Sequence, residues 1–259
     1  MIEVKNLSFA YGSREVLHDL SFTAKDGEVL SILGGNGVGK STLFRCMLGL
    51  LNGYTGSVYM DGTDIRTLSE RALAQRSAYI PQHTSTVFRY SAEDIVLMGT
   101  TASLGVFRTP GAEEKERAER ALERVGIAEL RKRCFHHLSG GERQLVIIAR
   151  ALAQGSNILM LDEPTSALDF GNQMRVLTQM RSLAREGYTV VQTTHNPEHA
   201  YMFSDRVIAL QAGRIAANGR AQEVLTEETI SRIYGLDVTV TSLFQDRVRI
   251  CTPRCIAEG

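Results

Sequence analysis

The sequence GGNGVGKST at residues 34–42 constrains this chain more than any other stretch. It fits the phosphate-loop pattern G-x-x-x-x-G-K-[ST]. Residues 28–33, directly before it, are apolar and β-prone, and residues 40–50 carry apolar side chains at helical spacing, with Gly49 near the expected end. A buried strand, a glycine loop and a helix in this order predict a nucleotide site.

The composition of this loop suits the binding of a triphosphate. Backbone N–H groups must replace the water around such an anion, and residues without side chains let the backbone approach it closely. The N-terminus of the following helix adds its dipole. Lys40 can reach the outer phosphates as a point charge, and the Ser41 hydroxyl suits Mg²⁺.

Composition and charge exclude several classes of protein. The chain has 259 residues, 43% of them hydrophobic, enough for one elaborate domain or a domain with an inserted part. Lys+Arg and Asp+Glu each number 29, so no overall basic field favours nucleic acid or anionic lipid. Residues 1–5 contain no apolar leader segment, and the longest unbroken apolar run, 145–149, is far shorter than a membrane span. We expect a cytosolic chain.

The four cysteines do not indicate a metal site. They lie at positions 46, 134, 251 and 255, and the close pair Cys251 and Cys255 has no second pair to complete a metal cage. Free thiols in a reducing cytoplasm are the expected state.

The N-terminal part reads as strands. Residues 2–9 alternate between apolar and polar, and residues 16–22 look like a returning partner. Tyr11, between them, is either an aromatic platform for a base or a hairpin tyrosine that packs its ring. Further on, residues 77–80 predict a strand, and Gln82 just beyond it either reaches Mg²⁺ or a water or is a solvated loop residue.

From residue 91 to 153 the pattern becomes helical. Apolar residues at 118, 121, 122 and 125 mark one helix, and its Glu–Arg pairs at i,i+4 spacing mark a solvated face. Residues 99–111 are loop-like. We interpret residues 88–150 as a mostly helical part inserted into an α/β core.

The sequence LSGGERQ at residues 138–144 opens a long helix. Ser139, Gly140 and Gly141 at a helix N-terminus offer free N–H groups, a hydroxyl and a positive dipole end, which together can accept an anion. By itself, this pattern favours an ordinary N-cap with a glycine turn.

Two carboxylates follow a buried strand at residues 158–161. Ligands of open α/β sheets lie at the carboxyl ends of the strands, where the phosphate loop also lies. Asp162 is therefore expected to hold Mg²⁺, and Glu163 to polarise an attacking water. A second buried strand at 188–194 ends at His195, which either bonds a γ-phosphate or caps local structure.

The last 34 residues, from Thr226, predict a short helix near 230–234 and two β-prone pieces, 238–241 and 247–251. We find no internal repeat and no low-complexity stretch.

Taken together, these segments resemble the nucleotide-binding subunit of an ATP-binding cassette (ABC) transporter over essentially the whole chain. The matching segments, in family order, are GGNGVGKST with the Walker A motif, Gln82 with the Q-loop, LSGGERQ with the signature, ILMLDEP with Walker B, residues 166–169 with the D-loop and His195 with the switch histidine. Tyr11 falls where the family has its adenine-stacking aromatic residue. LSGGERQ is the specific element, because other phosphate-loop families lack it.

The resemblance implies a RecA-like P-loop NTPase core of the α/β class, with a mixed sheet, an N-terminal antiparallel β part and an inserted helical subdomain. The implied boundaries are 1–87 and 151–225 for the core, 88–150 for the helical subdomain and 226–259 for a small C-terminal α/β tail.

The resemblance also implies an ATPase with ATP and Mg²⁺ as ligands. The residues expected to bind ATP are Tyr11, Gly34, Gly35, Asn36, Gly37, Val38, Gly39, Lys40, Ser41, Thr42, Gln82, Ser139, Gly140, Gly141 and Asp169. The expected metal ligands are Ser41, Gln82 and Asp162, and the expected catalytic residues are Glu163 and His195. Gly35 departs from the family, which commonly has proline there; we expect a modest effect.

The implied assembly is a homodimer in which two chains meet head to tail, each ATP lying between Lys40 of one and residues 139–141 of the other. Membrane permease subunits and, indirectly, an external binding protein are the other implied partners, and nucleic acid is not. The permease contact is expected at residues 86–90, 97–99 and 104–107, which are apolar for a loop. The chain is then expected at the cytoplasmic face of the cell membrane.

Finer features resemble the ATPases of importers for iron–siderophore, haem, cobalamin and related metal chelates. These features are LSGGERQLVIIARALAQ, DEPTSALDFGNQ and a tail that begins at Ile233. The alternatives are the ATPase of an exporter or of another small-solute importer, and a soluble ABC ATPase that acts on DNA or the ribosome. The last class usually carries long insertions, and this chain has none of that length.

Overall fold

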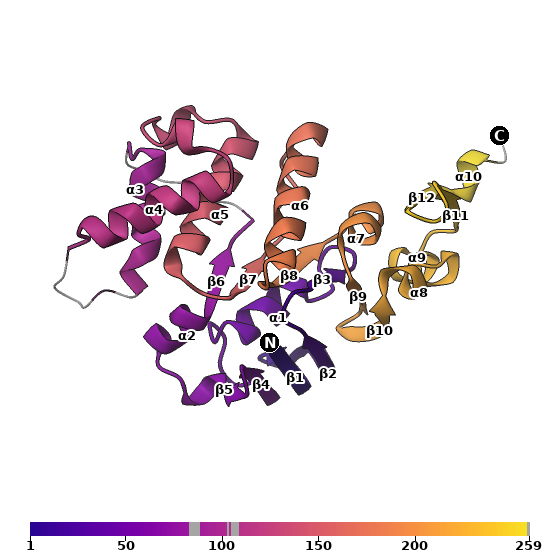
Figure 1. Ribbon diagram of the computed structural model, residues 1–259. Helices are drawn as coiled ribbons and strands as arrows, with labels where there is room; N and C mark the ends of the chain where they lie inside the picture. The colour runs from indigo at the N-terminus through magenta and orange to yellow at the C-terminus, as the bar shows by residue number, and fades with distance from the viewer. Residues whose placement is uncertain (83–88, 103, 105–108, 258–259) are drawn as a thin grey trace. The chain divides into compact units, whose positions relative to one another are not determined.

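The computed structural model describes residues 1–82, 89–102, 104 and 109–257. The chain forms two compact units (Figure 1). The first unit comprises residues 1–67 and 183–259, and the second comprises residues 68–182. The boundaries expected from the family resemblance remain a prediction.

An antiparallel sheet opens the first unit. Its strands run in the order β2-β1-β4-β5, with bounds β1 Ile2–Tyr11, β2 Arg14–Ala24, β4 Thr55–Met60 and β5 Thr63–Asp64. The predicted alternation of β1 is confirmed, because Ile2, Val4, Leu7 and Phe9 are buried. β1 pairs with β2 from Ile2 opposite Ala24 to Tyr11 opposite Arg14. The expected hairpin is therefore present.

A mixed sheet forms the centre of the first unit. Its strands there are β10 Arg214–Arg220, β9 Arg206–Gln211, β3 Val29–Leu33 and β8 Thr189–Thr194, in that spatial order. β3 runs parallel to both β8 and β9, whereas β10 is antiparallel to β9. All residues of β3 and β8 are buried, as parallel strands covered on both faces require.

Two helices follow strands of this sheet: α1 Lys40–Met47 after β3, and α7 Pro197–Phe203 after β8. α1 ends at Met47, and the predicted end near Gly49 is confirmed. Gly49 then adopts a left-handed backbone with φ of 67°, a conformation that favours glycine and stops a helix.

The C-terminal part of the first unit contains α8 Ala221–Val224, α9 Glu227–Tyr234, β11 Val238–Leu243, β12 Val248–Pro253 and α10 Arg254–Ala257. β11 and β12 form the two predicted β-prone pieces as an antiparallel hairpin. Ile230 and Ile233 of α9 are buried in one cluster with Tyr201 of α7 and Val207 of β9. The tail thus packs against α7 and the sheet edge.

The second unit is mostly helical. Its elements are α2 Glu70–Arg76, β6 Ser77–Ile80, α3 Ala92–Leu97, η2 Met98–Ala102, α4 Ala112–Arg124, η3 Ala128–Leu130, η4 Phe135–His137, α5 Gly140–Gln154, β7 Ile158–Leu161 and most of α6 Phe170–Arg185. β6 and β7 pair in parallel. The apolar residues expected on one face of α4, at 118, 121, 122 and 125, are all buried.

Pattern reasoning missed several elements. α2, α6, α7 and β10 were not predicted, although α6 is the longest helix at 16 residues. Of the described helices, none is long and apolar enough to cross a membrane.

Candidate nucleotide site

The phosphate loop begins where β3 ends. Its first residue, Gly34, lies close to the backbone of two neighbouring strands of the first unit. The Gly34 amide donates to the Thr194 carbonyl at 3.3 Å. A Cβ at Gly34 would lie 2.5 Å from the Leu210 carbonyl oxygen, so no side chain fits there. Since Thr194 directly precedes His195, the start of the loop and the candidate switch histidine lie at neighbouring strand ends.

Gly39 closes the loop and precedes α1. Its φ of 106° lies in a region that side-chain-bearing residues rarely adopt, and an added Cβ would lie 2.7 Å from Leu17 Cδ2. No side chain caps the N-terminus of α1 at this position. Gly39 thus offers no side-chain acceptor to this helix N-terminus, which is the kind of backbone position at which anions bind.

Lys40 is buried within the loop that it follows. Its Nζ donates to the carbonyl oxygens of Gly34 at 2.9 Å and Gly35 at 3.0 Å. These two carbonyls hold the ammonium group across the mouth of the loop. A phosphate that enters the loop would meet this charge at short range.

The environment of Tyr11 agrees in part with both interpretations of this residue, a packed hairpin tyrosine and an aromatic platform for a base. Its ring packs edge to face on Phe9, with 4.8 Å between ring centroids, as the packing alternative expects. The residue nevertheless remains 46% exposed at the end of β1. A ring face is thus available for stacking, and adenine binding by Tyr11 stays a prediction.

His195 follows β8 with an exposed side chain. Its backbone carbonyl accepts a hydrogen bond of 2.6 Å from the Tyr234 hydroxyl, which belongs to α9 of the same unit. Asn196 then caps α7 by accepting from the His199 amide at 3.0 Å. The capping of local structure is thus performed by Asn196, and the imidazole of His195 is left exposed for another role.

The carboxylates at 162 and 163 follow β7 in the second unit. Asp162 is buried, and its amide donates to the Ile80 carbonyl at 2.9 Å, which prolongs the β6–β7 pairing. Glu163 adopts φ of 45°. That left-handed conformation costs residues other than glycine about 1–3 kcal/mol and is concentrated at functional sites.

Gln82 contacts the second of these acids, Glu163. Its Nε2 donates to Glu163 Oε2 and to Ser166 Oγ, each at 3.2 Å. The interpretation of Gln82 as only a solvated loop residue is therefore incomplete, because its amide joins the residues after β6 to those after β7. The bonds use the amide nitrogen, so the amide oxygen Oε1 remains a possible metal ligand.

The signature segment forms a complete capping box at the start of α5. Ser139 Oγ accepts from the Glu142 amide at 3.3 Å, and Glu142 Oε2 accepts from the Ser139 amide at 2.7 Å. The hydrogen bonds that the Ser139 amide and, to a smaller extent, the Ser139 side chain give to the carboxylate hold the pKa of Glu142 below its ordinary value. The local pattern is that of an ordinary N-cap, as the sequence alternative allowed.

The second glycine of the signature segment, Gly141, lies where no side chain fits. An added Cβ would lie 2.1 Å from Asn172 Oδ1 and 2.6 Å from Asn172 Cβ, so Asn172 occupies the space of a side chain at 141. The Asn172 amide and side chain both donate to the Asp169 carboxylate, at 3.0 and 2.7 Å. The signature helix and the D-loop residue are thus joined through Asn172.

Comparison with known proteins identifies the family. The family described as ABC transporter matches residues 17–166. This chain belongs to that family. ATP-binding proteins of ABC transporters are ATPases, so the chain is an ATP-binding ATPase with the α/β P-loop fold of its relatives.

Several relatives match along nearly their full length. The hemin import ATP-binding protein HmuV of Rhodococcus jostii is 38% identical, over 92% of this chain and 81% of that protein. The iron(3+)-hydroxamate import ATP-binding protein FhuC of Bacillus subtilis is 33% identical, over 93% and 90%. A solved metal-chelate type ABC transporter, captured in an inward-facing conformation, matches with a TM-score of 0.86 and 33% identity, over 97% of this chain and 96% of that one.

The donor set of this ABC ATPase fits Mg²⁺ better than a softer metal. The expected ligands offer a hydroxyl, an amide oxygen and a carboxylate, and Mg²⁺ prefers such oxygens while completing its shell with phosphates and water. Within the described parts of the chain, no group of three or more His, Cys, Asp or Glu residues could form a metal cage of its own. A site shared with nucleotide phosphates is consistent with that composition.

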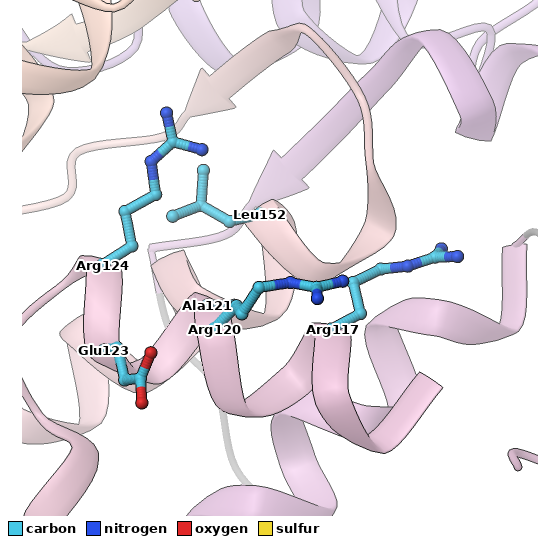
Figure 2. A pocket seen from close by; sticks show the side chains of 6 residues that line it. All are labelled: Arg117, Arg120, Ala121, Glu123, Arg124 and Leu152. Carbon is cyan, nitrogen blue, oxygen red and sulfur yellow. The ribbon is translucent and has the colours of Figure 1, made fainter. Parts of the chain in front are cut away.

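One hollow lies outside all the motifs. It measures about 540 Å³ and is lined by Arg117, Arg120, Ala121, Glu123 and Arg124 of α4 and Leu152 of α5 (Figure 2). Arg117 and Arg120 form ion pairs with Glu113 and Glu116, one turn before them. This is the solvated face expected from the sequence, and its charges are largely paired on the helix itself.

Sequence reasoning missed two residues of this site, Asn172 and Tyr234. Asn172 had a local signal, because it lies three residues after Asp169 at the start of a helix, where a capping aspartate accepts a backbone amide. Tyr234 had none, since its partner His195 lies 39 residues away in the chain.

Proposed function

We propose that this ATPase energises the import of a metal chelate of the haem, iron–siderophore or cobalamin type. The observation that carries the proposal is the match, over more than four fifths of their length, to import ATP-binding proteins for hemin and iron(3+)-hydroxamate. A cobalamin import ATP-binding protein of Halobacterium salinarum also matches, with 36% identity over 92% of this chain and 60% of that protein. The match to a metal-chelate type transporter points the same way.

The exporter alternative has weaker support. A bacterial Atm1-family exporter matches with 28% identity and a TM-score of 0.72, but this chain spans only 39% of that protein's length. The importer relatives named above are spanned over 81% and 90% of their length. The greater coverage of the importer relatives therefore favours the importer arrangement.

In the proposed mechanism, the phosphate loop binds ATP through its backbone amides and Lys40. Ser41, Asp162 and Gln82 would hold Mg²⁺, which would supply positive charge against the outer phosphates. Glu163 accepts a proton from the attacking water, and His195 donates a hydrogen bond to the γ-phosphate. Tyr11 stacks on the base.

Two copies of the chain are proposed to act as a homodimer. Ser139 and the amides of Gly140 and Gly141 in one chain would face the nucleotide held by Lys40 of the other. In support, the α5 N-terminus is exposed at Ser139 and Gly140. Asp169 bonds Asn172, and Asn172 lies against Gly141. A movement of Asp169 when two chains close on a nucleotide would therefore reach the signature helix.

The base role of Glu163 is tested by Glu163→Gln. The general base contributes about 10²–10⁴-fold to a rate, so hydrolysis should fall by that factor while ATP affinity is kept. Steady-state hydrolysis and equilibrium ATP binding are the measurements, with Glu123→Gln, an exposed acid of α4, as control. A Glu163→Gln protein that hydrolyses ATP at the normal rate would remove Glu163 from this role.

Membrane permease subunits are the proposed partners, and the cytoplasmic face of the membrane the proposed location. Part of the contact expected from the sequence, residues 86–88 and 105–107, lies outside the described residues. Of the rest, Leu104 is buried, so it is not available for contact. Met98 and Gly99 line a hollow of about 420 Å³ with residues of α2 and α5, and Met98 is 38% exposed. We place the permease contact at this hollow.

Two experiments test the permease contact and the identity of the chelate. Met98→Asp should abolish co-purification with a co-expressed permease of the metal-chelate type, whereas Leu50→Asp, on another exposed apolar residue, should not. Uptake of labelled haem, ferric hydroxamate and cobalamin by cells that express the transporter identifies the chelate. Uptake of none of the three, by a complex that hydrolyses ATP, would refute chelate import.

A further inference from the structure

The C-terminal tail of the first unit is bonded to the segment that follows β8. The Tyr201 hydroxyl of α7 donates to the Asp246 carbonyl at 2.8 Å, and the Arg249 guanidinium lies over the Tyr201 ring, 4.8 Å from its centroid. The Cys251 amide donates to the Glu198 carboxylate at 3.4 Å. The tail hairpin therefore holds α7 at several points.

A separate contact reaches His195 itself. The Tyr234 hydroxyl donates to the His195 carbonyl at 2.6 Å. Tyr234 is the last residue of α9, and Ile230 and Ile233 anchor that helix in the core. Gly235 then ends the helix in a left-handed conformation, with φ of 66°. The position of the hydroxyl is thus set by a well-packed helix end.

The bond from Tyr234 can orient the His195 side chain without covering it. The bond uses the main-chain carbonyl of His195, and the imidazole remains exposed. A fixed peptide plane fixes the Cα–Cβ direction, which decides where the imidazole can reach. On the other side, the Thr194 carbonyl accepts from the Gly34 amide of the phosphate loop. The two peptides around His195 are thus tied to the loop and to the tail.

We propose that Tyr234 is a positioning residue for ATP hydrolysis: the tail holds its hydroxyl against the His195 carbonyl and so orients the imidazole toward the γ-phosphate. This inference rests on the proposed role of His195. It gives the C-terminal tail a function in the chemistry of the nucleotide site.

The bond is not needed to hold the tail in place. Ile230 and Ile233 bury apolar surface in the cluster shared with α7 and β9, and the Tyr201 and Arg249 contacts anchor the hairpin independently. Removal of one hydroxyl from Tyr234 should leave this packing intact. An effect on hydrolysis would then report on the orientation of His195.

The test compares Tyr234→Phe with Tyr201→Phe. Each change removes one tyrosine hydroxyl from the contacts between the tail and the segment after β8, but only Tyr234 bonds His195. We expect Tyr234→Phe to lower kcat about tenfold, the effect of one hydrogen bond, with KM for ATP within twofold. Tyr201→Phe should leave kcat within twofold. Amide exchange at the start of α7, at residues 196–200, should become faster in Tyr234→Phe.

Tyr234→Phe in a His195→Ala background separates the positioning role of Tyr234 from the role of His195 in hydrolysis. If Tyr234 acts through His195, Tyr234→Phe causes no further loss there, because the group that it orients is absent. An equal loss in both backgrounds, an unchanged kcat in Tyr234→Phe, or unchanged exchange would each overturn the inference while His195 keeps its role. Normal hydrolysis by His195→Ala would refute the role of His195, and this inference with it.

Discussion

Two helices of this chain begin beside glycines, and they begin in opposite ways. α1 starts after Gly39, whose backbone is left-handed and which provides no side-chain cap. α5 starts after Ser139, whose hydroxyl and the Glu142 carboxylate form a complete capping box. The N-cap residue Gly39 offers α1 no side-chain acceptor, whereas two of the amides at the start of α5 have acceptors within the chain.

The difference shows what each glycine does. At α1, glycines permit a backbone path that no side chain allows, since a Cβ at Gly34 or Gly39 would meet neighbouring atoms within 3 Å. At α5, Gly141 gives space to Asn172. The first helix start is therefore built to bind an anion by itself, and the second is built as a stable surface that a nucleotide held elsewhere can meet.

The largest expected effect is at the second helix start. Ser139→Arg should lower hydrolysis by about 10²–10³-fold, the scale of losing a donor to the developing charge, because a bulky cation would keep α5 from the partner's nucleotide. ATP binding by the single chain should be unchanged. Hydrolysis and ATP affinity are the measurements, with Ser139→Ala as control. Normal hydrolysis by the Ser139→Arg chain would contradict the head-to-tail dimer.

At the start of α1, a substitution should affect ATP binding and not only hydrolysis. Lys40→Ala removes a buried charge that the loop holds through two carbonyls, so ATP binding itself should weaken, by about 1.5–3 kcal/mol for the lost charged hydrogen bonds. Titration of ATP against the isolated chain measures this loss. If Lys40→Ala kept its affinity and Ser139→Arg lost it, the assignment of the two helix starts would be reversed.

The role of Gly141 as a spacer predicts a stability effect. Gly141→Ala places a methyl group against Asn172 and should lower the free energy of unfolding by about 1–3 kcal/mol. Gly140→Ala is the matched control, because its Cβ would lie 3.2 Å from Leu168 Cδ2, at the end of a flexible side chain. Denaturant unfolding measures both. Asn172→Ala should restore part of the loss; an equal loss at both glycines would contradict the spacer role.

The smallest effect is expected at Gly35, where the family commonly has proline. Gly35 has no left-handed φ, and nothing lies within 4 Å of an added Cβ. Gly35→Ala should therefore raise the free energy of unfolding by about 0.4–1 kcal/mol by restricting the unfolded chain, with ATP affinity unchanged. A thermal melt and an ATP titration measure this, and destabilisation would show that glycine is required there.

Much of the fold could be predicted from residues alone because the signals are local. The alternation of β1, the buried run of β3, the helical spacing in α4 and the hairpin of the tail each follow from neighbours in the chain. The motifs are local as well, which is why their order identified the family before any contact was known. The end of α1 was predictable for the same reason, since the helix stops at Met47 and the following Gly49 turns the chain.

Only the tertiary structure decided what the motif residues contact. Gly141 makes room for Asn172, 31 residues later, and Gln82 bonds Glu163 across 81 residues. Tyr234 reaches the carbonyl of His195 from the far end of the chain. The left-handed backbone of Glu163 likewise depends on its surroundings. Periodicity and turn chemistry report only the nearest residues, whereas these contacts arise when buried strands and helices bring distant segments together.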